Sequence, residues 1–401
     1  MANFHTSAAS LLLFVSMTVF AQPVEVSLLT PEEVKTGKDA LARFNRSTKY
    51  VNRHPDQEAL YVAVQERCEI DDATGCLKHL VTQRHDVLRA LPDNPAYWQA
   101  FHDLLAASPH GTEPELIHQY RHERVDMSPL LDGVQWWFYR EIALNQTIDA
   151  ARYETFYRNL RRLSADSENS MERMFFTAAI GIAHFQMTML LSVYAANEDL
   201  EGVRVLQTLA KPYGTHERSL RKTFTGEARY AQASISIAKE INPEHFVNPD
   251  IVPTGPLAEV KAEMQMIAEV EYEQIIRELG LVSERSWSDY LRLAPVISDD
   301  EDYVLGFSPH ALLSFVATAR SSEVLIFIVQ ALADIHLGLA SPGEPQRPPP
   351  PYFNWSWQDE PSRVCLVPND LIVGRIDFST EHPACMPYID GAKVREFLPK
   401  F

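Results

Sequence analysis

Apolar residues recur at spacings of three and four along most of the chain, which is the pattern of helices that bury one face. After Leu257, for example, Val260, Met264 and Ile267 follow at these spacings, and Gly280 is placed to end the helix. No sustained alternation of apolar and polar residues, the pattern of half-buried strands, precedes the proline-rich segment near the C-terminus. The sequence therefore predicts an all-α body, built like a multi-helix bundle.

The pattern changes at residues 342–351, Pro-Gly-Glu-Pro-Gln-Arg-Pro-Pro-Pro-Pro. Proline has no amide hydrogen to donate, so this segment cannot continue a helix, and we expect an extended linker. It separates a helical domain, residues 22–341, from a small C-terminal appendage, residues 352–401. The sequence pattern of the appendage is typical of short strands. We expect the appendage to pack on the body, because Trp355 and Trp357 in open solvent would be unusual. The alternative is a partner-binding tail that exposes these aromatic side chains.

The N-terminus begins with a short apolar segment. Residues 8–21 contain no charged side chain and end with Ala21 at a position that suits a signal peptidase. The segment is shorter than the roughly 20 residues that span a bilayer. We therefore predict that residues 1–21 are a signal peptide that is removed on export. The alternative is an uncleaved segment that anchors the protein in the inner membrane.

A second apolar segment, residues 174–197, contains no Asp, Glu, Lys or Arg and is long enough to cross a bilayer. Polar side chains nevertheless follow one of its helical faces, among them His184 and Thr188. Arginines precede it and acidic residues follow it, which would break the positive-inside rule if the preceding residues are exported. We favour a core helix buried by its neighbours over a membrane span.

Composition and charge restrict the classes of function. The chain has 401 residues, of which 46% are hydrophobic and 22% charged, as in a folded globular protein. Only 15 residues are glycine, which disfavours glycine-rich architectures such as dinucleotide-binding sheets, propellers and barrels. The net charge of −18 opposes binding to nucleic acid or to anionic lipid, because both require Lys and Arg. We therefore expect no nucleic-acid partner.

The four cysteines form two pairs that are close in sequence, Cys68 with Cys76 and Cys365 with Cys385. Four cysteines permit three pairings, and the clustering favours the local one. A zinc site is the alternative, but neither pair has the Cys-x-x-Cys spacing. Disulfides form in oxidising compartments, so the cysteines and the N-terminal segment both predict a periplasmic or secreted protein.

One group of potential metal ligands stands out. Glu115 and His118 form a Glu-x-x-His pattern, and His122 lies one helical turn further on, so the three side chains share a helix face. A ferritin-like di-metal site needs a second Glu-x-x-His helix, which the sequence lacks. A site for one divalent metal, completed by a distant ligand, would make the protein a metal-dependent hydrolase. The alternative is a charged, solvent-facing helix surface.

Four further patterns are weaker. Ser236 and Lys239 match the Ser-x-x-Lys motif of penicillin-binding proteins, but the other elements of that family are missing or out of order, so we interpret the match as coincidence. His184 lies among apolar neighbours and is expected to be a hydrogen-bonded core histidine. Residues 136–139, Trp-Trp-Phe-Tyr, are expected to fill space between helices, with a ligand groove as the alternative. Residues 299–302 are four consecutive acids, typical of a solvated turn, with weak cation binding as the alternative.

Three stretches carry a family resemblance. They are Arg161-Arg162-Leu163 leading into residues 171–179, Thr-Gly-Glu-Ala-Arg at 225–229, and Pro-Pro-Tyr-Phe-Asn-Trp-Ser-Trp at 350–357. In these stretches the chain resembles a group of uncharacterised exported helical proteins of Gram-negative bacteria. The resemblance implies an envelope location and a helical fold, and it assigns no functional residue.

Taken together, these observations predict a soluble all-α protein of the bacterial envelope that acts by binding, as a scaffold or accessory factor for an envelope protein. No catalytic residue and no cofactor is assigned, apart from the divalent metal of the alternative. The two alternatives are the metal-dependent hydrolase and a component anchored in the inner membrane.

Overall fold

The computed structural model describes most of the chain. The described residues are 28–51, 53–68, 72–109, 127–211, 216–243, 252–283, 324–350, 353–359, 362–368 and 384–398. The predicted signal peptide, residues 1–21, lies outside them.

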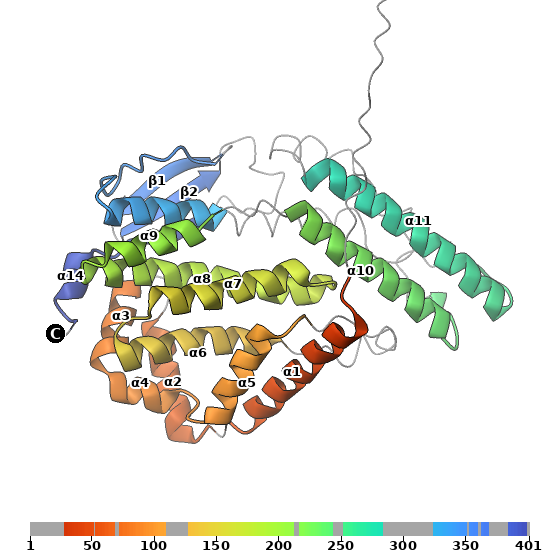
Figure 1. Cartoon of the computed structure of the whole chain (residues 1–401), viewed down its shortest axis with the longest axis horizontal. Coiled ribbons are helices and arrows are strands. Elements are labelled where there is room, and N and C mark those ends of the chain that lie inside the picture. The colour runs from red at the N-terminus through yellow and green to blue at the C-terminus, as the bar shows by residue number, and fades with distance from the viewer. Residues whose placement is uncertain are drawn as a thin grey trace, which may run out of the picture.

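The body is all-α, as the apolar periodicity predicts, and a small antiparallel sheet lies near the C-terminus (Figure 1). The elements are α1 (Pro31–Lys49), α2 (Pro55–Arg67), α3 (Ala73–Thr82), α4 (Arg84–Ala90), α5 (Pro95–Ala106), α6 (Ser128–Asn145), α7 (Ala150–Asp166), α8 (Ser170–Ala196), α9 (Leu200–Leu209), α10 (His216–Ile237), α11 (Leu257–Ser283), β1 (Phe353–Asp359), β2 (Ser362–Pro368), β3 (Ala384–Pro387) and α14 (Gly391–Arg395). A further apolar helix covers Val324–His336.

Local sequence signals fix where many of these helices begin. α1 starts with a capping box, in which Thr30 and Glu33 each accept a hydrogen bond from the other's backbone amide. α5, α7 and α8 are capped by the side chains of Asn94, Asp149 and Asn169. These caps satisfy amides that have no partner within the helix, so each helix starts at a residue that the sequence specifies.

α8 is the central helix of the body and packs against α6, α7 and α9. Within the described part of the chain it is the one helix that is long and apolar enough to cross a membrane, but most of that stretch is buried inside the protein. Its polar side chains bond to nearby backbone: Thr188 and Ser192 donate to carbonyls of the preceding turn, and Gln186 donates to the carbonyl of Val134 at 3.1 Å. α8 is thus packed as the core helix that the sequence analysis favours.

The C-terminal sheet has the strand order β1-β2-β3 and packs on the helical body. Cys365 lies directly opposite Cys385 in the register of β2 and β3, and a disulfide joins them. Phe353 and Leu366 belong to the same hydrophobic core as the helices. The indole nitrogen of Trp355 donates to the carbonyl of Arg347 at 2.7 Å. The appendage therefore contributes to the core, as expected, and its short strands are present.

The proline-rich segment is tied to the body by an ion pair to a buried aspartate. Arg347 forms an ion pair with Asp334, which lies in the Val324–His336 helix and is 6% exposed. Gln207 of α9 also donates to this carboxylate, at 2.6 Å. The segment is not extended throughout as predicted, because its first residues form a tight turn in which Ser341 bridges to Glu344 and Gly343 has a φ of 86°. The contacts of Arg347 fix the course of the residues that follow.

α10 and α11 form a hairpin that projects from the body (Figure 1). Residues of the hairpin make a separate hydrophobic cluster that includes Ile235, Val260 and Met264. α11 follows the predicted apolar spacing, but it continues to Ser283, so the predicted end at Gly280 is wrong by one turn. Near the body, α10 contacts α7 and α8.

Gly226 allows α10 to approach the turn between α7 and α8. A Cβ atom at this position would lie 2.4 Å from the backbone oxygen of Glu168, which cannot move away as a side chain can. Close packing of backbone on backbone thus explains the glycine between Thr225 and Glu227.

This contact gives a prediction with a matched control. Gly226→Ala is expected to lower the free energy of unfolding by about 2 kcal/mol or more, because the turn must shift. Gly181→Ala in α8 meets no atom within 4 Å and is expected to raise it by about 0.5–1 kcal/mol, since alanine is the better helix former. Urea unfolding of both variants measures the two changes. Changes of the same sign would contradict this account.

Candidate functional site

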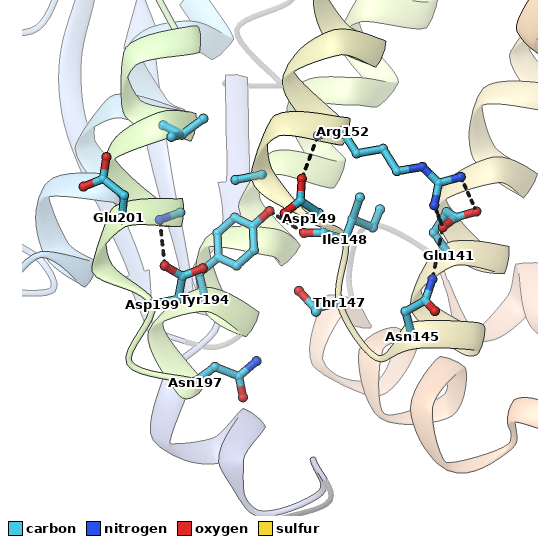
Figure 2. Close-up of a pocket in the computed structure, with 13 residues that line it drawn as sticks. Glu141, Asn145, Thr147, Ile148, Asp149, Arg152, Tyr194, Asn197, Asp199 and Glu201 are labelled. Carbon is cyan, nitrogen blue, oxygen red and sulfur yellow. Dashed lines mark hydrogen bonds and ion pairs between the residues drawn. The ribbon is translucent and has the colours of Figure 1, made fainter. Parts of the chain in front are cut away.

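The candidate site is a cleft at the end of the body where two interhelical turns meet (Figure 2). One turn joins α6 to α7 and the other joins α8 to α9, and the cleft between them has a volume of about 480 Å³. Most of the residues that line it have polar or charged side chains: Glu141, Asn145, Thr147, Ile148, Asp149, Ala150, Arg152, Tyr194, Asn197, Asp199, Glu201, Gly202 and Val205.

Both turns are held in an unfavourable backbone conformation. Gln146 and Glu198 have φ angles of 64° and 61°, and they are the two non-glycine residues with positive φ in the described part of the chain. The left-handed region costs a non-glycine residue about 1–2 kcal/mol. Strained backbone of this kind concentrates at functional sites, where the surrounding structure enforces it. Its occurrence in both turns of one cleft marks this cleft as the candidate site.

Each turn ends in an aspartate that caps the next helix. Asp149 accepts a hydrogen bond from the amide of Arg152 at 3.0 Å, and Asp199 accepts one from the amide of Gly202 at 2.9 Å. Each aspartate therefore lies at the positive end of a helix, where a negative charge is favoured. The caps hold the two carboxylates in place at the cleft.

Tyr194 connects the two turns. Its hydroxyl donates to the carbonyl of Ile148 at 2.6 Å, which joins the end of α8 to the turn before α7. Burial raises the pKa of this hydroxyl, and the carboxylates of Asp199 and Asp149 raise it further. Tyr194 therefore stays neutral and acts as a fixed hydrogen-bond donor between the turns.

A buried carboxylate forms one wall of the cleft. Glu141 of α6 is 1% exposed and pairs with the guanidinium of Arg152 through both of its oxygens. Arg140 lies 3.3 Å from one of these oxygens, and Asn145 donates to the other at 3.1 Å. A charge this deep is stable only with such partners. The pair links α6 to α7 and sets the position of Arg152 in Figure 2.

The cleft carries an excess of negative charge. Glu141, Asp149, Asp199 and Glu201 line it with Arg152 as their one cationic neighbour in the lining. Glu201 also forms a surface ion pair with Arg204 at 3.4 Å, which solvent weakens. Such a lining favours a ligand group that is cationic and donates hydrogen bonds. Its side chains can recognise and orient such a group.

A second cleft, of about 610 Å³, lies on the other side of the Glu141 network. Arg140 belongs to its lining, and the guanidinium stacks over Trp98 at 5.2 Å from the ring centre. His54 and His85 line it as well, and both are strongly exposed. Its lining combines side chains of both charges with two histidines, and it lacks the left-handed turns of the first cleft.

The predicted metal ligands Glu115, His118 and His122 lie outside the described residues, as does the acidic run at 299–302. The metal site therefore stays a prediction. Among the side chains that the structure does describe, no group of three or more His, Cys, Asp or Glu is arranged to hold a metal ion.

The other patterns take the places that the sequence analysis favours. His184 is buried, and its Nε2 lies 2.8 Å from the hydroxyl of Tyr157. The aromatic residues 136–139 are all buried, and Trp137 stacks on Phe156 with ring centres 4.1 Å apart. Ser236 and Lys239 are both exposed near the C-terminal end of α10. Both predicted disulfides, Cys68–Cys76 and Cys365–Cys385, are formed.

Comparison with protein-family models, with curated proteins and with solved structures finds no match to this chain.

Proposed function

We propose that the protein is an exported, non-catalytic binding protein of the bacterial envelope, which serves as a scaffold or accessory factor for another envelope protein. Two features support the location. Disulfides are typical of oxidising compartments, and the half-cystines of both bridges are buried or nearly so. The predicted signal peptide, residues 1–21, with its apolar segment at 8–21, supplies an export signal.

The observation that carries the binding function is the strained, acidic cleft of Figure 2. Helix caps hold the carboxylates of Asp149 and Asp199, and the pair with Arg152 holds that of Glu141, so a ligand meets three preformed carboxylates. Preformed sites bind well because little further ordering is needed on association. The negative lining suits a Lys or Arg side chain presented by a partner protein.

Site-specific photo-crosslinking in cells tests this proposal. A photoreactive residue at Asn197, which is exposed at the mouth of the cleft, is expected to give a discrete crosslinked species with a protein. Glu201→Lys should abolish that species, because the added cation repels a cationic group. The control places the photoreactive residue at Glu66, an exposed position of α2. The same crosslink from Glu66, or none from Asn197, would argue against the cleft as a contact surface.

The predicted export is tested by measuring the mass of the mature protein and the oxidation state of its four cysteines. Protein purified from the periplasm of its natural host is expected to begin at Gln22 and to resist alkylation at all four cysteines until it is reduced. Carbonate extraction of membranes should release it into the supernatant. Retention of Met1 together with four alkylated thiols would refute export, and retention in the membrane pellet would support the anchored alternative.

A further inference from the structure

The outer side of α11 presents a short apolar line to solvent. Met266 and Val270 are 65% and 63% exposed and lie one turn apart. Glu263 and Glu273 continue the same line at spacings of three, which places them before and after the apolar pair on one helix face. Most exposed apolar residues on proteins occur singly, so an adjacent pair on a projecting hairpin is notable.

Acidic side chains surround this pair. We define the α11 outer face as the residues Glu259, Glu263, Met266, Glu269, Val270 and Glu273, all of them exposed. In the described part of the chain, none of these four glutamates pairs with a cation. The nearby Lys261 donates to the carbonyl of Ser236 at 2.9 Å, so its charge is directed toward α10. The face is therefore apolar at its centre and negative at its rim.

The hairpin holds this face in place without using it. The inward side chains of α11, among them Val260, Met264 and Ala268, form the separate cluster with α10. The outward side chains of α11 therefore do not pack in that cluster. A rigid helix with one buried and one unused face is the arrangement in which a second helix can pack.

We infer that the α11 outer face docks an amphipathic helix of a partner protein, one that carries two apolar side chains a turn apart with Lys or Arg on either side. The inference rests on the proposed binding function and adds a second contact surface with a defined partner chemistry. The apolar pair supplies burial, and the glutamate rim selects cationic flanks.

The same charges disfavour two other occupants. A second copy of this chain would place glutamates opposite glutamates on either side of the apolar pair, and like charges at a helix interface are unfavourable. An anionic lipid surface would repel the rim for the same reason. A cationic helix is thus the occupant that satisfies both the apolar centre and the acidic rim.

Titration with a defined probe tests the inference. The probe is a fluorescent 18-residue peptide of alanine with two central leucines one turn apart and lysines on the same face at both ends. We expect saturable binding to the full-length protein by fluorescence anisotropy. The double variant Met266→Gln/Val270→Gln should weaken it roughly tenfold. Glu263→Gln/Glu269→Gln should weaken it similarly and reduce its dependence on salt.

Two controls separate docking from general attraction to an acidic protein. A peptide of the same composition, with its leucines and lysines scrambled over all faces, should bind at least about tenfold more weakly. Leu339→Gln, which removes another exposed apolar side chain, should leave binding unchanged. Equal binding of both peptides, or no loss in the Met266/Val270 variant, would overturn the inference. The crosslink from Asn197 tests the cleft and does not depend on peptide binding to α11. Failure of this inference can therefore be distinguished from failure of the proposed function.

Discussion

Replacing Arg152 with methionine is expected to lower the free energy of unfolding by about 3–5 kcal/mol. The side chain of Glu141 is only 2% exposed, and Arg152 is its main partner. Without Arg152, a buried carboxylate keeps only the neighbouring Arg140 at 3.3 Å and one amide bond from Asn145. Methionine preserves most of the apolar stem, so the loss reports on the charge rather than on packing.

The same helix provides a matched control. Arg158 pairs with Glu154 at 2.6 Å across one turn of α7, but this carboxylate is 32% exposed, whereas that of Glu141 is 2% exposed. Exposed pairs of this kind contribute only about 0.3–0.5 kcal/mol, so Arg158→Met should have little effect. Urea unfolding at neutral pH compares the two. Adding Glu141→Gln to Arg152→Met should recover part of the loss, because the uncompensated charge is then gone. If both arginine substitutions lowered the free energy of unfolding equally, the pair between Glu141 and Arg152 would not have the stabilising role given to it here.

Much of the fold could be predicted because its signals are local. The spacing of Val260, Met264 and Ile267 predicts α11, and the proline run predicts the extended segment before the sheet. Two pairs of cysteines close in sequence predict the two disulfides. In each case residues within about twenty positions of one another determine the outcome, and helix and turn chemistry suffices to interpret them.

The cleft could not be predicted because its parts meet only in the folded chain. Glu141 and Arg152 lie on different helices, and Asp199 lies two helices further along. Nothing in the sequence indicates that Glu141 is buried and paired with Arg152. The one local signal is the segment Asn-Gln-Thr-Ile-Asp at 145–149, which is typical of a helix end followed by an N-cap. That signal predicts a turn, and it gives no indication that a second turn packs beside it.

For His184, too, the local sequence predicts one feature and only the folded structure shows the other. Its apolar surroundings predict a core position, and the structure confirms it. Its partner, the hydroxyl of Tyr157, comes from α7 and follows only from the packing of α7 on α8. The consequence for stability depends on that packing, because burial penalises the charged imidazolium.

Acid is expected to destabilise the protein through His184 by about 3 kcal/mol between pH 7 and pH 4. Burial, together with the positive charge of Arg161, lowers the pKa of His184 from 6.5 to about 3 in the folded protein. Above the unfolded pKa of 6.5 the histidine is neutral in both states, and its full contribution is present. As the pH falls below 6.5, the unfolded chain binds a proton that the folded chain does not accept until about pH 3, so stability is lost across this window.

Other groups titrate in the same range, so the comparison between variants is decisive. Burial also lowers the pKa of His336, to about 4, whereas it raises the pKa of Glu168, which has the opposite effect on stability. His184→Gln removes the titrating ring and should reduce the loss of unfolding free energy between pH 7 and pH 4 by about 3 kcal/mol, whatever its effect at pH 7. The control His85→Gln alters an 86% exposed side chain and should leave the loss unchanged. If the unfolding free energies of wild type and His184→Gln changed with pH in parallel, the folded protein would accommodate the charged imidazolium. A fully buried ring beside Tyr157 and Arg161 should not allow this, so that outcome would contradict the prediction.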